Sequence, residues 1–131
     1  MEIDEVPSYE LTIETHFAAA HLLRGYPGDC ARLHGHNWQV ALYVECSELD
    51  DIGLAVDYKI LKRELKEALA KWDHYHLNDI APFDTINPSS ENVARVLYEE
   101  MSRRLDDERL RVSRVQIGET CTARVTYRPK A

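Results

Sequence analysis

The sequence predicts an α+β fold in which two amphipathic helices cover one face of a four-stranded antiparallel sheet. Near each end of the chain, apolar residues alternate with polar ones, which is the period of a strand that is buried on one face. The middle of the chain instead repeats apolar residues at the spacing of a helix. The predicted order is therefore strand, strand, helix, helix, strand, strand.

The first part of the chain contains two predicted strands. Residues 9–16 alternate between apolar and polar side chains, and residues 36–46 do so more regularly, with Trp38 at the start of their apolar face. The stretch 22–33 between them is rich in Gly, Pro and Asp, which predicts a loop. The two strands are expected to pair antiparallel because neighbours in sequence usually lie side by side.

The two predicted helices follow. Residues 57–72 carry one apolar stripe with Lys and Glu opposite, and a polar loop with two prolines comes next. Ser89 or Ser90 can cap the second helix, with Glu91 in its first turn near the positive end of the helix dipole. An apolar stripe then continues to Leu105.

Two closing strands, residues 111–119 and 121–128, complete the predicted sheet. Four strands that are covered on one face leave two open edges, and open edges favour assembly into a larger barrel. Of the cysteines in the predicted strands, Cys46 and Cys121 are both expected to serve in packing.

Composition narrows the class of protein. The length of 131 residues predicts a single domain over residues 1–131, and no apolar stretch is long enough to span a membrane. The acidic residues 1–5 do not resemble a signal peptide, and an odd number of cysteines without a C-x-x-C pair argues against a disulfide scaffold. A cytoplasmic location is therefore expected. The net charge of -7 argues against general nucleic-acid binding.

Three histidines have the spacing of a metal site. His34 and His36 lie two apart at the start of a strand, so both imidazoles point to the same face. His21 follows the neighbouring strand, and three imidazoles leave the fourth position open, as in a catalytic zinc site. Copper, iron and nickel also suit imidazole, and the alternative is that these are loop histidines without a ligand role.

Cys30 lies four residues before His34, in the loop that leads to the metal-binding strand. A nearby zinc ion or imidazolium lowers the pKa of a thiol, which favours the reactive thiolate. We expect Cys30 to be a reactive group beside the metal. The alternatives are a fourth ligand and an inert thiol.

Five segments of the chain resemble the 6-pyruvoyl-tetrahydropterin synthase superfamily, in the order of that family. They are residues 17–21, 30–36, 73–79, 87–92 and 119–123. Within the superfamily, the C-x-x-x-H-G-H spacing of Cys30 and His34 is similar to that of bacterial 6-carboxy-tetrahydropterin synthases, whereas the animal pyruvoyl enzymes have two more residues there. Ser89 stands where the family commonly has Thr, and Tyr58 stands where it commonly has Phe.

The resemblance implies the tunnelling fold, in which trimers form a twelve-stranded barrel and two trimers stack into a hexamer. It also implies a zinc-dependent reaction of the queuosine pathway that converts 7,8-dihydroneopterin triphosphate to 6-carboxy-5,6,7,8-tetrahydropterin, acetaldehyde and triphosphate. Two alternatives remain open, namely a 6-pyruvoyl-tetrahydropterin synthase and a non-catalytic pterin-binding zinc protein on the same scaffold. A cupin-type metal enzyme fits poorly because of the two central helices.

The resemblance assigns roles to individual residues. Cys30 is the implied general base. Asp73 and His74 are an acid/base dyad that joins the zinc site of a neighbouring subunit. Glu119 is the implied anchor of the pterin ring, because a carboxylate can accept two hydrogen bonds from its amino and ring N–H groups. The resemblance also assigns three residues to the pterin pocket through their hydroxyl and carboxylate groups, namely Ser89, Ser90 and Glu91.

Two further expectations concern charged and titratable side chains. A triphosphate requires cations, and four candidates exist, namely Arg24, Arg32, Lys59 and Arg128. The sequence does not rank them, and solvated surface charge is the ordinary role of such residues. His76, which lies close to the dyad, is expected to be a solvated loop residue.

Overall fold

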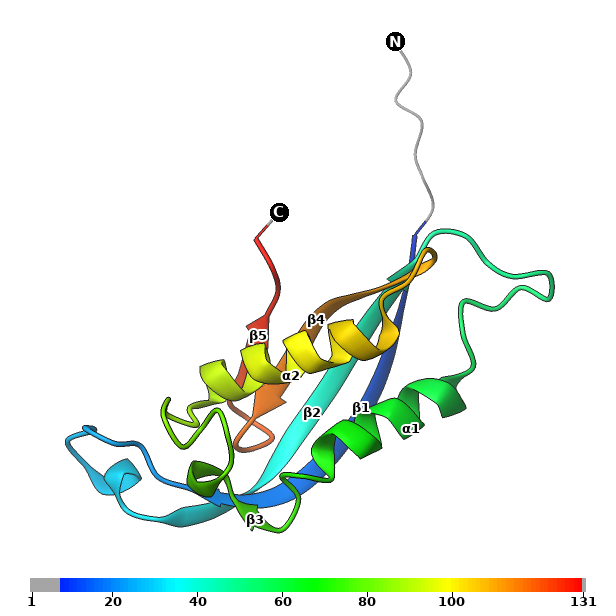
Figure 1. Ribbon diagram of the computed structural model, residues 1–131. Helices are drawn as coiled ribbons and strands as arrows, with labels where there is room; N and C mark the ends of the chain where they lie inside the picture. Colours follow the sequence, from blue (N-terminus) through cyan, green and yellow to red (C-terminus); the bar gives the residue numbers. More distant parts are fainter. Residues whose placement is uncertain (1–7, 131) are drawn as a thin grey trace.

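The computed structural model describes residues 8–130, so the acidic residues 1–5, on which the expectation about a signal peptide rests, lie outside the described part. Figure 1 shows the chain as one sheet with both helices on the same face. The elements, in chain order, are β1 (Tyr9–His21), β2 (His34–Cys46), α1 (Tyr58–Leu69), β3 (Tyr75–His76), α2 (Ser90–Leu105), β4 (Leu110–Gly118) and β5 (Arg124–Tyr127). No helix of the described residues is both long and apolar enough to cross a membrane.

The four predicted strands form the sheet and pair antiparallel, β1 with β2, β2 with β4 and β4 with β5. β1 is longer than predicted and continues to His21, because the small residues after Phe17 remain extended beside β2. The α+β architecture is thus confirmed.

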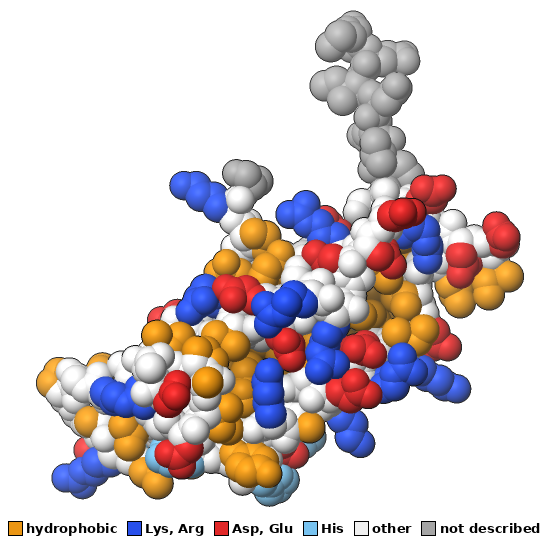
Figure 2. Space-filling model, in the orientation of Figure 1, with side chains coloured by type: hydrophobic (Ala, Val, Ile, Leu, Met, Phe, Trp, Pro, Cys, Tyr) orange, Lys and Arg blue, Asp and Glu red, His pale blue; other side chains and the backbone are white. Residues whose placement is uncertain are grey.

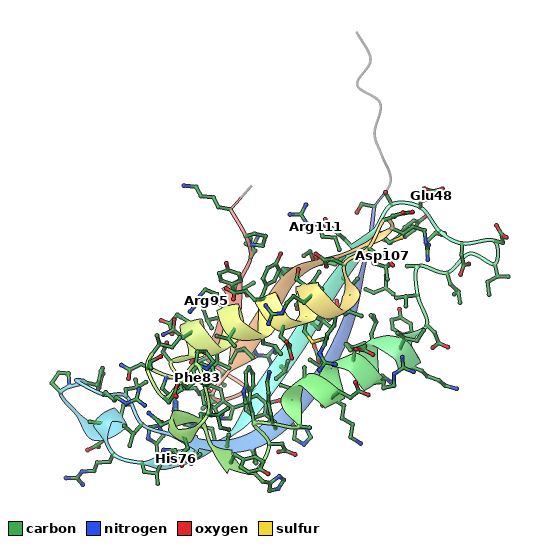
Figure 3. All side chains as sticks on the ribbon, viewed as in Figure 1. Glu48, His76, Phe83, Arg95, Asp107 and Arg111 are labelled. Carbon is green, nitrogen blue, oxygen red and sulfur yellow. The ribbon has the colours of Figure 1, made fainter. Side chains whose placement is uncertain are left out.

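The prediction of four antiparallel strands is wrong in one respect. A fifth strand, β3, pairs parallel to β1 through Ala19 with Tyr75 and Ala20 with His76, so the sheet is mixed and has the order β3-β1-β2-β4-β5. Two residues are too few to show any periodicity, so the sequence gives no signal for this strand. His76 belongs to this short strand and is labelled in Figure 3. Its side chain is only partly exposed, and its Nε2 atom is buried. The expectation that His76 is a solvated loop residue is therefore wrong.

The core fills the space between the sheet and the helices. Phe17 of β1 stacks on Trp38 of β2, with 5.7 Å between ring centroids, and Trp72 packs against Phe17 from the turn after α1. All three rings are buried. On the outer surface, Lys and Arg side chains alternate with Asp and Glu over both helices (Figure 2), as expected for solvated helix faces.

The helix ends and the cysteines complete the comparison with the sequence. Ser89, rather than Ser90, caps α2, because its side chain accepts a hydrogen bond from the backbone N–H of Asn92. Cys46 is buried in the core, as predicted. The packing role predicted for Cys121 is wrong, since β5 begins only at Arg124 and Cys121 is exposed in the turn before it.

Candidate metal centre

The three histidines meet at one end of the β1–β2 pair. His21 is the last residue of β1 and lies opposite His34, the first residue of β2, and His36 follows on the same face. One nitrogen from each imidazole lies within 4.8 Å of the other two, so the group could hold a metal ion. The His-x-His spacing and the position of His21 thus bring the predicted ligands together.

The hydrogen bonds of the rings fit a metal. The Nδ1 atom of His21 lies 2.7 Å from the carbonyl oxygen of Pro88, and Nδ1 of His34 lies 2.7 Å from that of Arg32. A carbonyl only accepts, so both Nδ1 atoms carry the proton and each Nε2 keeps its lone pair. The Nε2 atoms of His21 and His36 are buried and have no hydrogen-bond partner. Buried nitrogen acceptors with backbone-anchored rings are typical of metal ligands.

Burial also sets the protonation state of these rings. It lowers the pKa of His21 and that of His36 below the ordinary value of histidine. The Pro88 carbonyl opposes this shift at His21, and the Glu119 carboxylate opposes it at both rings. Neutral imidazole is the form that binds a metal, so the site favours metal over protons at neutral pH.

Glu119 lies beside the histidines. Its Oε1 atom is 3.7 Å from Nε2 of His21, and its Oε2 atom is 3.6 Å from Nε2 of His36. The tight turn after β4 positions it, since a Cβ atom at Gly118 would lie 2.6 Å from the Thr120 carbonyl oxygen and only glycine fits there. The position of Glu119 beside the three histidines was not predicted from the sequence. The predicted strand pairing could have indicated this position. When β4 pairs antiparallel with β2, the end of β4 lies close to the start of β2, and Glu119 directly follows β4.

The start of α2 connects the histidines to Glu119. Pro88 contacts His21 through its carbonyl, Ser89 caps the helix, and the hydroxyl of Ser90 donates to Oε1 of Glu119 over 3.1 Å. Of the three residues predicted to line the pterin pocket, Ser90 therefore contacts the predicted ring anchor directly. Ser89 acts on the helix, and Glu91 is exposed.

Asp73 and His74 contact each other but do not belong to the histidine group. Nδ1 of His74 lies 3.0 Å from Oδ1 of Asp73, and the same carboxylate oxygen accepts the backbone N–H of Ala18. That hydrogen bond is the main reason that the pKa of Asp73 lies below its usual value, so the carboxylate is ionised. The His74 ring is 81% exposed, and it lines a shallow hollow together with His36.

Cys30 occupies a short 3-10 helix, Asp29–Ala31, in the loop before β2. It is half-buried, and its carbonyl accepts a hydrogen bond from the backbone of Leu23, which fixes the loop. Among residues 8–130, the group of potential metal donors comprises the three imidazoles and does not include the Cys30 thiol. The reactive role of Cys30 stays a prediction.

Arg24 has a structural role that the sequence did not reveal. Its guanidinium donates to the carbonyl oxygens of Phe83 and Ile86, at 2.7 and 3.3 Å, and its backbone pairs with the side-chain amide of Asn87. It thereby joins the loop after β1 to the loop before α2. Of the other candidate cations, Arg32 and Arg128 are exposed, and Lys59 lies in α1, whose first turn is at the other end of the molecule in Figure 1.

Replacing Arg24 with alanine should lower the free energy of unfolding by about 1–3 kcal/mol, because the carbonyls of Phe83 and Ile86 lose a charged donor. The matched control Arg32→Ala should change it by less than about 0.5 kcal/mol, since that exposed side chain makes no hydrogen bond within residues 8–130. Urea unfolding followed by circular dichroism measures both. Equal losses in the two variants would contradict the role assigned to Arg24.

The protein should bind one divalent metal per chain, and His36→Gln should weaken that binding by more than about tenfold. His16→Gln is the matched control, because His16 lies on β1 with its side chain exposed. Metal content after equilibrium dialysis, measured by mass spectrometry, gives both values. If His36→Gln keeps the metal content of the control, the assignment of His36 as a ligand is wrong.

Known proteins resemble this chain in sequence and in fold. The family model described as 6-pyruvoyl tetrahydropterin synthase matches residues 10–130. The 6-carboxy-5,6,7,8-tetrahydropterin synthase of Bacillus subtilis (strain 168) is 35% identical over 130 residues, which cover 94% of this chain and 87% of the relative. The protein of that name from Synechocystis is 32% identical over 87% of this chain and 88% of its own.

The solved structure of Caenorhabditis elegans 6-pyruvoyl tetrahydropterin synthase superposes with a TM-score of 0.84 at 26% identity. The superposition covers 98% of this chain and 100% of the Caenorhabditis elegans chain. This similarity confirms the fold of the single chain that the family resemblance implied. The chain belongs to the 6-pyruvoyl tetrahydropterin synthase family.

Proposed function

We propose that the protein is a zinc-dependent lyase that converts 7,8-dihydroneopterin triphosphate to 6-carboxy-5,6,7,8-tetrahydropterin, acetaldehyde and triphosphate, a step toward queuosine. One observation carries the proposal, namely the meeting of three imidazoles with the carboxylate of Glu119 at one end of the sheet. Relatives at 32% and 35% identity that bear the name of this activity support it.

In this proposal, Glu119 binds the pterin ring. Its two oxygens accept hydrogen bonds from the amino group and the ring N–H, and the Ser90 hydroxyl orients the carboxylate. The three histidines hold zinc, which when bound polarises the oxygens of the substrate side chain. Glu119 and the metal ligands together orient the pterin so that its side chain faces the histidines.

Cys30 and the Asp73–His74 pair transfer protons. Cys30 removes protons from the substrate side chain, and the imidazole of His74, whose Nδ1 atom lies 3.0 Å from Oδ1 of Asp73, exchanges them. This carboxylate is ionised at neutral pH because the Ala18 N–H lowers its pKa. His74 is therefore suited to act as acid and as base in turn.

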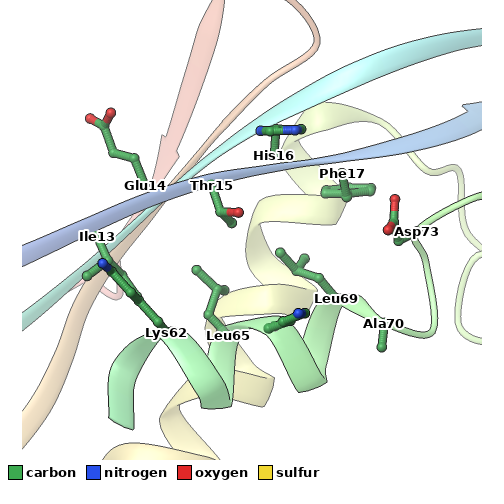
Figure 4. Close-up of a pocket in the computed structure, with 11 residues that line it drawn as sticks. Ile13, Glu14, Thr15, His16, Phe17, Lys62, Leu65, Leu69, Ala70 and Asp73 are labelled. Carbon is green, nitrogen blue, oxygen red and sulfur yellow. The ribbon is translucent and has the colours of Figure 1, made fainter. Parts of the chain in front are cut away.

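The exposure of His74 supports an active site that is shared between subunits. Within the described residues, β3 pairs only with Ala19 and Ala20, so the outer edge of β1 before them is open. A cavity of about 390 Å³ lies between this edge and α1, and Figure 4 shows Asp73 at one end of it. We propose that a neighbouring chain lies along this edge in a cytoplasmic homohexamer, and that His74 serves the neighbour's metal centre.

Incubation of the zinc-loaded protein with 7,8-dihydroneopterin triphosphate should yield 6-carboxy-5,6,7,8-tetrahydropterin and acetaldehyde. Mass spectrometry identifies the pterin, and derivatisation identifies the aldehyde. A pyruvoyl product without acetaldehyde would make the protein a 6-pyruvoyl-tetrahydropterin synthase, for which the spacing between Cys30 and His34 is unsuited. Binding without turnover would make it a pterin-binding protein. His36→Gln, which lacks a ligand, is the negative control.

Cys30→Ala and His74→Gln should each keep the metal and lose turnover, whereas a mixture of the two with exchanged subunits should regain activity. If each site takes Cys30 from one chain and His74 from the next, random mixing leaves about a quarter of the sites intact. Turnover before and after subunit exchange measures the recovery. An inactive mixture would mean that both groups act within one chain, and loss of metal from Cys30→Ala would make that residue a ligand.

A further inference from the structure

The Glu119 carboxylate spans two of the metal-binding nitrogens. Each of its oxygens faces a different imidazole, Oε1 toward His21 and Oε2 toward His36. The contacts measure 3.7 and 3.6 Å, which is longer than the hydrogen bond of 2.7–3.2 Å that a nitrogen donor makes to oxygen. A hydrogen bond to either imidazole therefore does not account for the position of this carboxylate.

The separation instead fits ligands of a common ion. A nitrogen and an oxygen that each lie about 2.0–2.1 Å from a tetrahedral zinc ion are about 3.3 Å apart. The two observed distances exceed this by a few tenths of an ångström. Only a small side-chain adjustment would therefore bring the carboxylate into the coordination sphere with His21 and His36.

The surroundings of Glu119 leave a charge to be balanced. Its side chain is 31% exposed, and within residues 8–130 no Lys or Arg nitrogen lies within 4.0 Å of it. The buried Nε2 atoms of His21 and His36 do lie within 4.0 Å of it, and they have no hydrogen-bond partner. A half-buried carboxylate beside neutral, unpartnered nitrogens favours a cation between them.

Ser90 holds the carboxylate in this position. Its hydroxyl donates to Oε1 over 3.1 Å from the first residue of α2, and the same segment anchors the His21 ring through the Pro88 carbonyl. The start of α2 therefore fixes the positions of both the His21 ring and the Glu119 carboxylate. The arrangement is built before any ligand arrives.

We propose that Glu119 is a fourth ligand of the metal in the substrate-free protein, and that binding of a pterin ring withdraws this carboxylate from the metal. The second part rests on the proposed function. A carboxylate that accepts two hydrogen bonds from the planar N–C–N edge of a pterin directs both oxygens at the ring, so it no longer faces the imidazoles. The position needed by the substrate side chain then opens only when a ring with that edge is bound.

Cobalt-loaded protein tests the first part without any turnover, because the visible absorption of Co²⁺ reports its ligands. Glu119→Gln should shift this spectrum and weaken Co²⁺ binding by at least about tenfold. Glu108→Gln, at an exposed position in the turn before β4, is the matched control and should match the wild type. An unchanged spectrum and affinity in Glu119→Gln would overturn the proposal, and loss of pterin binding by that variant would still support the anchor role in the proposed function.

Titration of the cobalt protein with pterin that lacks a C6 side chain tests the second part. This probe has no side-chain oxygen to bind the metal, so a change in the spectrum reports the departure of Glu119. We expect the wild-type spectrum to change and that of Glu119→Gln to remain constant. A wild-type spectrum that stays constant while pterin fluorescence shows binding would overturn the exchange.

Discussion

The register between β1 and β2 is the constraint on which the rest of the molecule depends. The two strands pair along their whole length, from Tyr9 opposite Cys46 to His21 opposite His34. Side chains alternate between the two faces of a sheet, so a shift by one residue would turn every side chain of one strand to the other face. The Phe17–Trp38 stack in the core and the histidine group at the strand ends therefore depend on the same alignment.

The loops around the site are fixed by a few polar links. Asn78 accepts the backbone N–H of Leu22 and donates to its carbonyl, and Arg24 connects the same loop to the segment before α2. These links hold the Pro88 carbonyl against His21. The metal centre thus has a strand end on one side and a helix terminus on the other, and the packed core supports both.

The sequence predicted those parts of the molecule that repeat. Alternation identified four strands, helical spacing identified α1 and α2, and the His-x-His pair identified two of the three histidines that come together, because each pattern lies within one element. The sequence did not predict β3, because two residues are too few to show a pattern. It also did not predict that Cys121 is exposed, because this depends on where β5 begins. It also missed the structural role of Arg24, since contacts between loops leave no periodic trace.

The backbone at His74 carries a further consequence. Its φ angle is +67°, a left-handed conformation that glycine adopts without cost and that other residues adopt at about 1–2 kcal/mol. The N–H of His74 donates to the Ala18 carbonyl, and the Asp73 side chain accepts the Ala18 N–H, so one residue of β1 holds the turn. A drift toward glycine at this position would relieve strain and delete the imidazole. In the proposed function, selection for stability and selection for proton transfer would therefore act in opposite directions on this single residue.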